Sequence, residues 1–169
     1  VEIQMEIDKR IAGNKLFAVL YADIDNFKSY NDAYGYASGD RAIKVTADII
    51  VENVKAHGNP DDFTGHIGGD DFIVISTPDK IETIAKEIIS DFDKRAVELY
   101  SKEDAQRGYV VTSDRQGQSV KVPLITISLA IVTNEAIELT SHGQISEILT
   151  VLKNKAKAIP KSTYTIYAK

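Results

Sequence analysis

The stretch from His66 to Ile75, which reads His-Ile-Gly-Gly-Asp-Asp-Phe-Ile-Val-Ile, decides how the rest of the chain is interpreted. Gly68 and Gly69 end one extended run, and four apolar residues begin another almost immediately. Because glycine adopts backbone angles that other residues resist, this pattern predicts a tight β-hairpin. Two adjacent carboxylates, Asp70 and Asp71, lie at its tip. Gly-Gly-Asp-Asp is also ordinary turn chemistry, so a functional interpretation of the acids requires a second acidic cluster.

A second acidic cluster follows the apolar run 17–22, which is typical of a central strand buried on both faces. That run ends in Asp23-Ile24-Asp25-Asn26. If this strand lies beside the hairpin, Asp23, Asp70 and Asp71 meet at one edge of the sheet. Carboxylates so close repel one another, and a hard divalent cation with oxygen ligands neutralises them. The spacing therefore predicts a metal-dependent phosphoryl-transfer site, as in a polymerase palm, although strand ends also carry Asp as solubilising caps.

Bulk composition narrows the function classes. The chain has 169 residues, 43% of them hydrophobic and 27% charged, which suits one globular domain with a sizeable core. A formal net charge of −5 argues against nucleic-acid or membrane-surface binding. The absence of Cys excludes disulfides and Cys-based zinc sites. No apolar run reaches the length of a bilayer span and no signal peptide opens the chain, so we expect a cytoplasmic location.

The remaining chain mixes helical and extended patterns. Apolar residues recur at helical spacing over 3–11, 43–54, 81–99 and 145–152, and extended runs cover 17–22, 72–75, 124–132 and 163–167. Asn31-Asp32 and Gly35 predict a loop, after which Asp40 is expected to open the second helix. The segment 108–122 predicts a protruding hairpin. These patterns predict an α+β or α/β sandwich, with one sheet covered by helices.

The motifs, taken together, resemble the GGDEF domain of diguanylate cyclases. They occur in the family's order: Asp23-Ile-Asp25-Asn-Phe27-Lys28, Asn31-Asp32, Gly35, Gly39-Asp40 and Gly68-Gly69-Asp70-Asp71-Phe72. The resemblance covers nearly all of 1–169, which we expect to form a single GGDEF-like domain of a longer multidomain signalling protein. It implies an α+β sandwich with a central, mostly antiparallel sheet flanked by helices, related to nucleotidyl cyclases and polymerase palms.

The resemblance also implies an activity and a metal site. Family members join two GTP molecules into cyclic di-GMP in a head-to-head homodimer. Asp23, the Ile24 carbonyl and Asp70 would bind Mg²⁺ (or Mn²⁺). Asp71 would serve metal binding and catalysis.

Contacts to GTP are implied in the same way. Asn31 and Asp40 match the positions that hydrogen-bond the guanine edge. The backbone amides around Phe27 and Lys28 would meet the β- and γ-phosphates. Lys157 and Lys161 align approximately with the family's late basic phosphate contacts, although a solvated helix end explains them equally well.

The chain departs from the family pattern in several places. Asp71 stands where the family has Glu and is one methylene shorter. His66 occupies a position that is commonly Arg, and we prefer a packing or capping role for it. The segment 59–62, Asn-Pro-Asp-Asp, replaces the Arg-x-x-Asp motif of product inhibition, and Asn59 lacks the bidentate guanidinium of Arg. The segment 108–122 is longer than the usual connection.

Three functions remain open from the sequence. The first is a Mg²⁺-dependent diguanylate cyclase, driven by an upstream sensor or receiver domain; the intact Asp23, Asn31, Asp40 and Asp70 favour it. The second is a degenerate module that binds GTP and regulates a partner without making product, which the Asp71 variant favours. The third is a cyclase acting on a single nucleotide.

Overall fold

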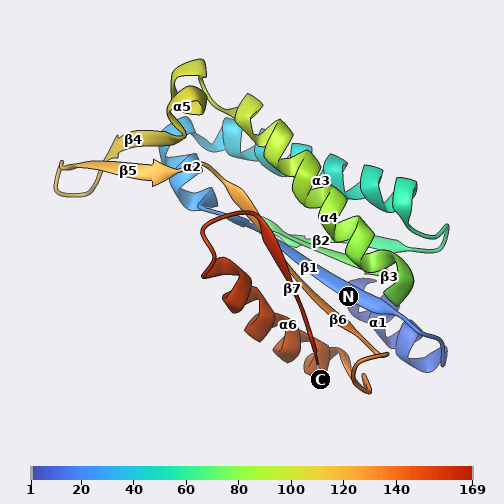
Figure 1. Cartoon of the computed structure of the whole chain (residues 1–169). Coiled ribbons are helices and arrows are strands. Elements are labelled where there is room, and N and C mark those ends of the chain that lie inside the picture. The colour runs from blue at the N-terminus through green and yellow to red at the C-terminus, as the bar shows by residue number, and fades with distance from the viewer. Residues whose placement is uncertain (1, 169) are drawn as a thin grey trace.

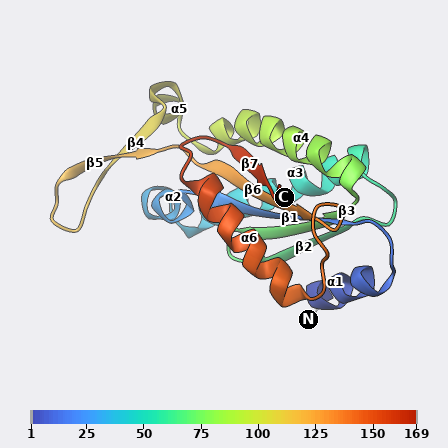
Figure 2. The same cartoon turned by 60° about the horizontal axis from the view of Figure 1, so that its bottom comes forward.

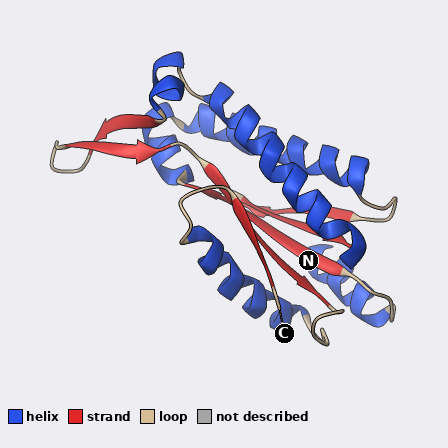
Figure 3. Ribbon diagram, viewed as in Figure 1, coloured by secondary structure: helices blue, strands red, loops and turns tan. Residues whose placement is uncertain are grey.

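The computed structural model describes residues 2–168, which build one five-stranded sheet with helices on both faces and a separate hairpin (Figures 1 and 3). The helices are α1 (Glu2–Ala12), α2 (Phe27–Tyr34), α3 (Tyr36–His57), α4 (Pro78–Ala96), α5 (Lys102–Arg107) and α6 (His142–Lys157). The strands are β1 (Ala18–Asp25), β2 (Phe63–Gly68), β3 (Asp71–Ser76), β4 (Tyr109–Ser113), β5 (Ser119–Pro123), β6 (Thr126–Thr133) and β7 (Thr163–Ile166).

The sheet has the order β2-β3-β1-β6-β7. Every neighbouring pair is antiparallel except β6 and β7, which run parallel. The predicted α+β sandwich with a mostly antiparallel sheet is therefore confirmed. Among residues 2–168, no helix combines the length and the apolar composition that crossing a bilayer requires.

The two faces of β1 belong to two different cores. Ala18, Leu20, Ala22 and Ile24 pack with the apolar sides of α3 and α4. Val19 packs with α1 and α6 on the opposite face, together with Ile73 and Ile75 of β3. Figure 2 shows α1 and α6 on the side of the sheet away from α3 and α4. Since side chains alternate along a strand, the odd-numbered Tyr21, Asp23 and Asp25 share the α6 side of the sheet. This alternation therefore places the side chains of Asp23 and Asp25 on the face of the sheet that α6 covers.

The predicted loop at Asn31–Gly35 is wrong, because residues 31–34 complete α2 and only Gly35 separates α2 from α3. Phe27, Tyr30 and Tyr34 recur at helical spacing and provide an inward face. Tyr30 is buried, stacks on Tyr34 with ring centroids 5.0 Å apart, and meets Tyr100 edge-on at 5.1 Å. This aromatic packing outweighs the local turn preference of the polar residues. Consequently α3 begins at Tyr36, and Asp40 lies within its second turn instead of opening it.

Two further boundaries differ from the sequence prediction. Strand β1 continues through Asp25, because its ladder with β6 extends to the pair Asp25 and Thr126. Helix α4 ends at Ala96, so Leu99 is buried from a separate 3-10 turn. The hairpin expected within 108–122 is confirmed: β4 and β5 pair only with each other among the described strands and protrude from the body (Figure 1).

Candidate functional site

The hairpin tip is shaped by two glycines. Gly68 and Gly69 have φ of 148° and 55°, a backbone region that disfavours side chains, and the ladder has an irregularity just before them. His66 stacks on Phe72 with centroids 4.8 Å apart, and its Nε2 lies 2.8 Å from the Gly69 carbonyl oxygen. These contacts match the packing or capping role preferred for His66. They fix the tip from which Asp70 and Asp71 project.

The structure brings the three predicted carboxylates together. Asp23 pairs with Asp71 across the β1–β3 ladder, and the Ile24 N–H donates to the Asp70 carbonyl over 3.3 Å. One carboxylate oxygen from each of Asp23, Asp70 and Asp71 lies within 4.8 Å of the others. Asp23 is only 7% exposed, whereas Asp70 and Asp71 are half-buried. We call Asp23, Asp70 and Asp71 the acidic cluster.

Burial and like charge both act on the acidic cluster. The pKa of Asp23 is raised to about 7: loss of solvation on burial is the largest cause, Lys157 opposes it, and nearby Asp71 and Asp70 add to it. A site in which three carboxylates converge favours a bound cation. The donor set consists of oxygen alone, which fits Mg²⁺ or Mn²⁺. Asp23 and Asp70, with Asp71 beside them, are the residues that could hold such an ion.

Two lysines of α6 reach the acidic cluster from the far end of the sequence. The Lys157 Nζ lies 2.8 Å from Asp25 Oδ1 and 3.2 Å from Asp23 Oδ2. The Lys153 Nζ lies 4.0 Å from Asp23 Oδ2. Sequence analysis missed Lys153, although its position one turn before Lys157 puts both on one helix face. Lys161 is exposed after α6, and no ion pair within residues 2–168 includes it.

Asp25 has a different environment from Asp23. It accepts hydrogen bonds from Thr126 Oγ1 at 2.7 Å and Ser128 Oγ at 2.8 Å, in addition to Lys157. These partners neutralise the Asp25 carboxylate and fix the end of β1 to β6. Asp25 therefore braces the strand that carries Asp23 and stands apart from the acidic cluster.

Helix α2 begins immediately after Asp25. Asn26 adopts a left-handed conformation (φ 62°) that turns the chain from strand into helix, and its side chain does not cap α2. The first N–H groups of an α-helix, here from Phe27 and Lys28, have no partner within the helix. Phe27 packs against the core and orients the helix, whereas Lys28 is exposed. The arrangement places positive helix-dipole charge next to the acids, which suits an anion.

Asn31 of α2 lies against Gly39 of α3, the residue before Asp40. The Asn31 Oδ1 is buried without a hydrogen-bond partner among the described residues. It contacts Gly39 so closely that a Cβ there would lie 1.7 Å from Oδ1. Asp40 is the next residue and is exposed. A buried acceptor without a donor costs ~1–3 kcal/mol, so a ligand that donates to it would gain affinity.

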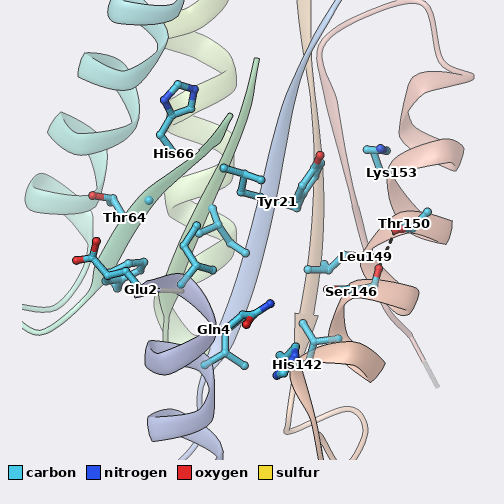
Figure 4. Close-up of a pocket in the computed structure, with 17 residues that line it drawn as sticks. Glu2, Gln4, Tyr21, Thr64, His66, His142, Ser146, Leu149, Thr150 and Lys153 are labelled. Carbon is cyan, nitrogen blue, oxygen red and sulfur yellow. Dashed lines mark hydrogen bonds between the residues drawn. The ribbon is translucent and has the colours of Figure 1, made fainter. Parts of the chain in front are cut away.

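A cleft of about 670 Å³ lies beside the acidic cluster, between α1, β2 and α6 (Figure 4). Tyr21 and Lys153 line it, and neither Asp23 nor the hairpin acids do. The Lys153 Nζ lies over the Tyr21 ring, 5.3 Å from its centroid. The cleft and the acidic cluster are thus neighbours, and Tyr21 and Lys153 border both of them.

The segment that replaces the product-inhibition motif is folded on itself. The Asn59 N–H donates to Asp62 Oδ2 over 2.8 Å, and Ser76 Oγ donates to the same oxygen over 2.6 Å. The Asn59 side-chain amide bonds Asp62 Oδ1 at 3.1 Å and Thr77 Oγ1 at 2.8 Å. Asp62 therefore stabilises the turn between α3 and β2.

Comparison with known proteins agrees with this geometry. The family model described as "Diguanylate cyclase, GGDEF domain" matches residues 1–126. The chain belongs to the GGDEF domain family. The resemblance drawn from the scattered motifs is confirmed.

Bacterial relatives share sequence with this GGDEF domain over part of its length. It is 33% identical over 90 residues to the bifunctional diguanylate cyclase/cyclic di-GMP phosphodiesterase MucR of Pseudomonas aeruginosa, covering 52% of this chain and 13% of MucR. It is 32% identical over 74 residues to the probable diguanylate cyclase DgcT of Escherichia coli, covering 44% of this chain and 16% of DgcT. The chain thus spans under a fifth of the length of these two relatives.

Solved structures confirm the fold of this GGDEF domain. The GGDEF domain of DgcB from Caulobacter crescentus, determined in complex with c-di-GMP, superposes with a TM-score of 0.67. The alignment covers 98% of this chain and 85% of that one, at 18% sequence identity. At this identity the likeness shows the fold alone.

Proposed function

We propose that this GGDEF domain is a diguanylate cyclase that condenses two GTP molecules into cyclic di-GMP with Mg²⁺ or Mn²⁺. The observation that carries the proposal is the convergence of Asp23, Asp70 and Asp71 within 4.8 Å, next to the first turn of α2. An acidic cluster for a cation and free backbone amides for phosphates are the two parts that binding a nucleoside triphosphate requires.

The reaction consists of two successive nucleotidyl transfers. The 3′-hydroxyl oxygen of one GTP attacks the α-phosphorus of the other, the bond to the β-phosphate breaks, and pyrophosphate leaves with its electron pair. Asp71 would accept the hydroxyl proton. Asp23 and Asp70 would hold the metal, which would neutralise charge at the phosphates and polarise the reacting oxygens. The second ester forms in the same way and closes the ring.

This chain's residues bind and orient the nucleotide. The amides of Phe27 and Lys28 contact the β- and γ-phosphates, and Lys157, already beside Asp23, adds positive charge to them. Asn31 and Asp40 accept hydrogen bonds from the guanine edge. Lys161 contributes from the loop after α6, provided that loop folds toward the phosphates.

Each chain offers one nucleotide site, so two chains must meet for two GTP molecules to react. Holding reactants in register can contribute ~7–11 kcal/mol of barrier reduction. We therefore propose a catalytic homodimer, controlled by a sensor or receiver domain elsewhere in a longer protein. Because the reaction consumes GTP, we propose that this domain works in the cytoplasm.

The test is turnover. The chain is incubated with GTP and Mg²⁺ or Mn²⁺, and cyclic di-GMP and pyrophosphate are quantified at a 1:2 ratio. Asp70→Asn should abolish product, whereas Asp48→Asn, which removes an exposed acid of α3, should not. Product formation that survives Asp70→Asn would overturn the site assignment.

A second function rests on one observation, the Asp at position 71 where the family has Glu. In this alternative the domain binds GTP and regulates a partner without making product. GTP binding that requires Asp70, with no cyclic di-GMP at any protein concentration, would support the regulatory module over the cyclase.

A further inference from the structure

Tyr21 is the aromatic residue closest to the acidic cluster along β1. It lies two positions before Asp23 on the same face of the strand. Tyr21 is opposite Ile73, and Asp23 is opposite Asp71, so Asp71 is the diagonal neighbour of Tyr21. Long side chains reach diagonal neighbours on an antiparallel sheet. Burial raises the pKa of Tyr21 and the Asp71 carboxylate raises it further, which agrees with a Tyr21 hydroxyl that lies on the side of Asp71.

Lys153 of α6 contacts the face of the Tyr21 ring. The Lys153 Nζ lies 5.3 Å from the ring centroid and 4.0 Å from Asp23 Oδ2, so one ammonium contacts both the ring and the cluster. A cation over an aromatic face is attracted by the negative charge of the ring face. Figure 4 shows Tyr21 and Lys153 facing each other at one end of the cleft. The hydroxyl is thereby kept beside the acids.

Asp71 needs such support more than a longer side chain would. Its carboxylate lies within 4.8 Å of two other carboxylates and is half-buried, so repulsion favours rotation toward water. As an Asp it is one methylene shorter than Glu and has less reach toward a shared cation. A hydrogen bond from the Tyr21 hydroxyl would offset part of the repulsion and fix the direction of the carboxylate.

We propose that Tyr21 is a positioning residue, whose hydroxyl holds the Asp71 carboxylate in the acidic cluster and so raises the affinity of the cluster for a divalent cation. This inference rests on the proposed function, in which the cluster binds metal. Hydrogen bonds that orient metal ligands typically change metal affinity by about 10- to 100-fold. Tyr21→Phe, which retains the ring beneath Lys153, should therefore weaken Mn²⁺ binding by about 10-fold or more.

The test measures Mn²⁺ binding by calorimetry, without nucleotide, in four proteins: the unsubstituted chain, Tyr21→Phe, Asp71→Glu and the double variant. Glu at position 71 would carry its carboxylate one methylene farther from the backbone, away from the Tyr21 hydroxyl. Tyr21→Phe should then reduce Mn²⁺ affinity by a smaller factor in the Asp71→Glu background than in the unsubstituted chain. Thermal unfolding of each protein is recorded in parallel, because a purely structural role would change the unfolding midpoint and leave metal affinity unchanged.

Tyr164→Phe is the matched control. The Tyr164 hydroxyl also bonds a carboxylate, that of Glu82 at 3.0 Å, but Tyr164 packs on the opposite face of the sheet with α4. This variant should bind Mn²⁺ as tightly as the unsubstituted chain.

The possible outcomes distinguish a failure of the Tyr21 positioning role from a failure of metal binding itself. A loss of about 10-fold or more in Tyr21→Phe that shrinks in the Asp71→Glu background is the expected result. Unchanged affinity in Tyr21→Phe, or an equal loss in both backgrounds, overturns the positioning role while metal binding stands. An unsubstituted chain that binds no Mn²⁺ overturns the proposed function and this inference with it.

Discussion

The ammonium of Lys157 lies 3.2 Å from the carboxylate of Asp23, in the space where a cation bound by the acidic cluster would compete with it. We therefore expect Lys157 to have two opposing effects: it would repel a metal ion from the free site and attract the phosphates of a nucleotide. Lys157→Met should strengthen Mn²⁺ binding without nucleotide about fivefold, equivalent to ~1 kcal/mol for a partly exposed pair, and weaken GTP binding. Calorimetry with each ligand checks both signs. A loss of both affinities would contradict the competition.

Asp70→Ala should abolish metal-dependent GTP binding. The variant removes one of the cluster's three carboxylates and leaves the hairpin glycines unchanged. Binding of GTP in Mg²⁺ is measured by calorimetry, with Asp48→Ala as the control for loss of one negative charge. Unchanged affinity in Asp70→Ala would show that the nucleotide binds elsewhere.

Gly39→Ala should reduce the preference for guanine. A Cβ at position 39 would lie 1.7 Å from Asn31 Oδ1, so the Asn31 side chain must move out of its buried position. Each lost hydrogen bond to a buried group costs ~1–3 kcal/mol, and adenine lacks the N1–H and the 2-amino group that donate to Asn31 and Asp40. The ratio of GTP to ATP affinity is the measurement.

The same variant leaves the acidic cluster intact, so its affinity for Mn²⁺ alone should stay constant. Equal affinities for GTP and ATP in the unsubstituted chain would refute the base pocket itself.

Cyclic di-GMP should not inhibit this domain through the segment 59–62. Asp62 is bonded to Asn59 and Ser76, and no Arg precedes it in the motif position. Asp62→Ala should instead lower the free energy of unfolding by ~1–3 kcal/mol, because Ser76 and the Asn59 N–H lose their acceptor. Denaturant unfolding measures this loss. Tight cyclic di-GMP binding that Asp62→Ala removes would prove the prediction wrong.

Cyclase activity should depend on dimer population. Specific activity is expected to rise with protein concentration and to rise further when a coiled coil is fused to the chain, since one chain presents one nucleotide. Specific activity that is independent of both would indicate a reaction completed within a monomer, as in a cyclase acting on a single nucleotide.

The hairpin and the acidic cluster could be predicted because their signals are local. Gly68 and Gly69 are typical of a tight turn. A buried strand that ends in Asp23 needs a neighbouring strand on each side, and β3 is a suitable neighbour. The helix α2 was missed for the opposite reason. Asn31 and Gly35 favour a loop by themselves, and the helix is stabilised by tertiary packing such as that of Tyr30 against Tyr100, seventy residues away along the chain.

The electrostatic contacts between residues far apart in the sequence could not be predicted either. Asp25 looked equivalent to Asp23 in sequence, and the difference arises from Thr126, Ser128 and Lys157, which reach it from β6 and α6. The orphaned Asn31 Oδ1 likewise depends on how tightly Gly39 allows two helices to approach. Such distinctions follow from packing geometry, which periodicity does not encode.

The bond between Lys157 and Asp25 joins residues 132 positions apart. Closing a loop of this length costs chain entropy, and contacts of high sequence separation slow folding. Before α6 docks, the acids on β1 and the hairpin lack Lys153 and Lys157, and their repulsion acts against the sheet. The docking of α6 therefore completes the site and relieves this repulsion. A chain that stalls before α6 during synthesis would carry its acids on an unsupported sheet.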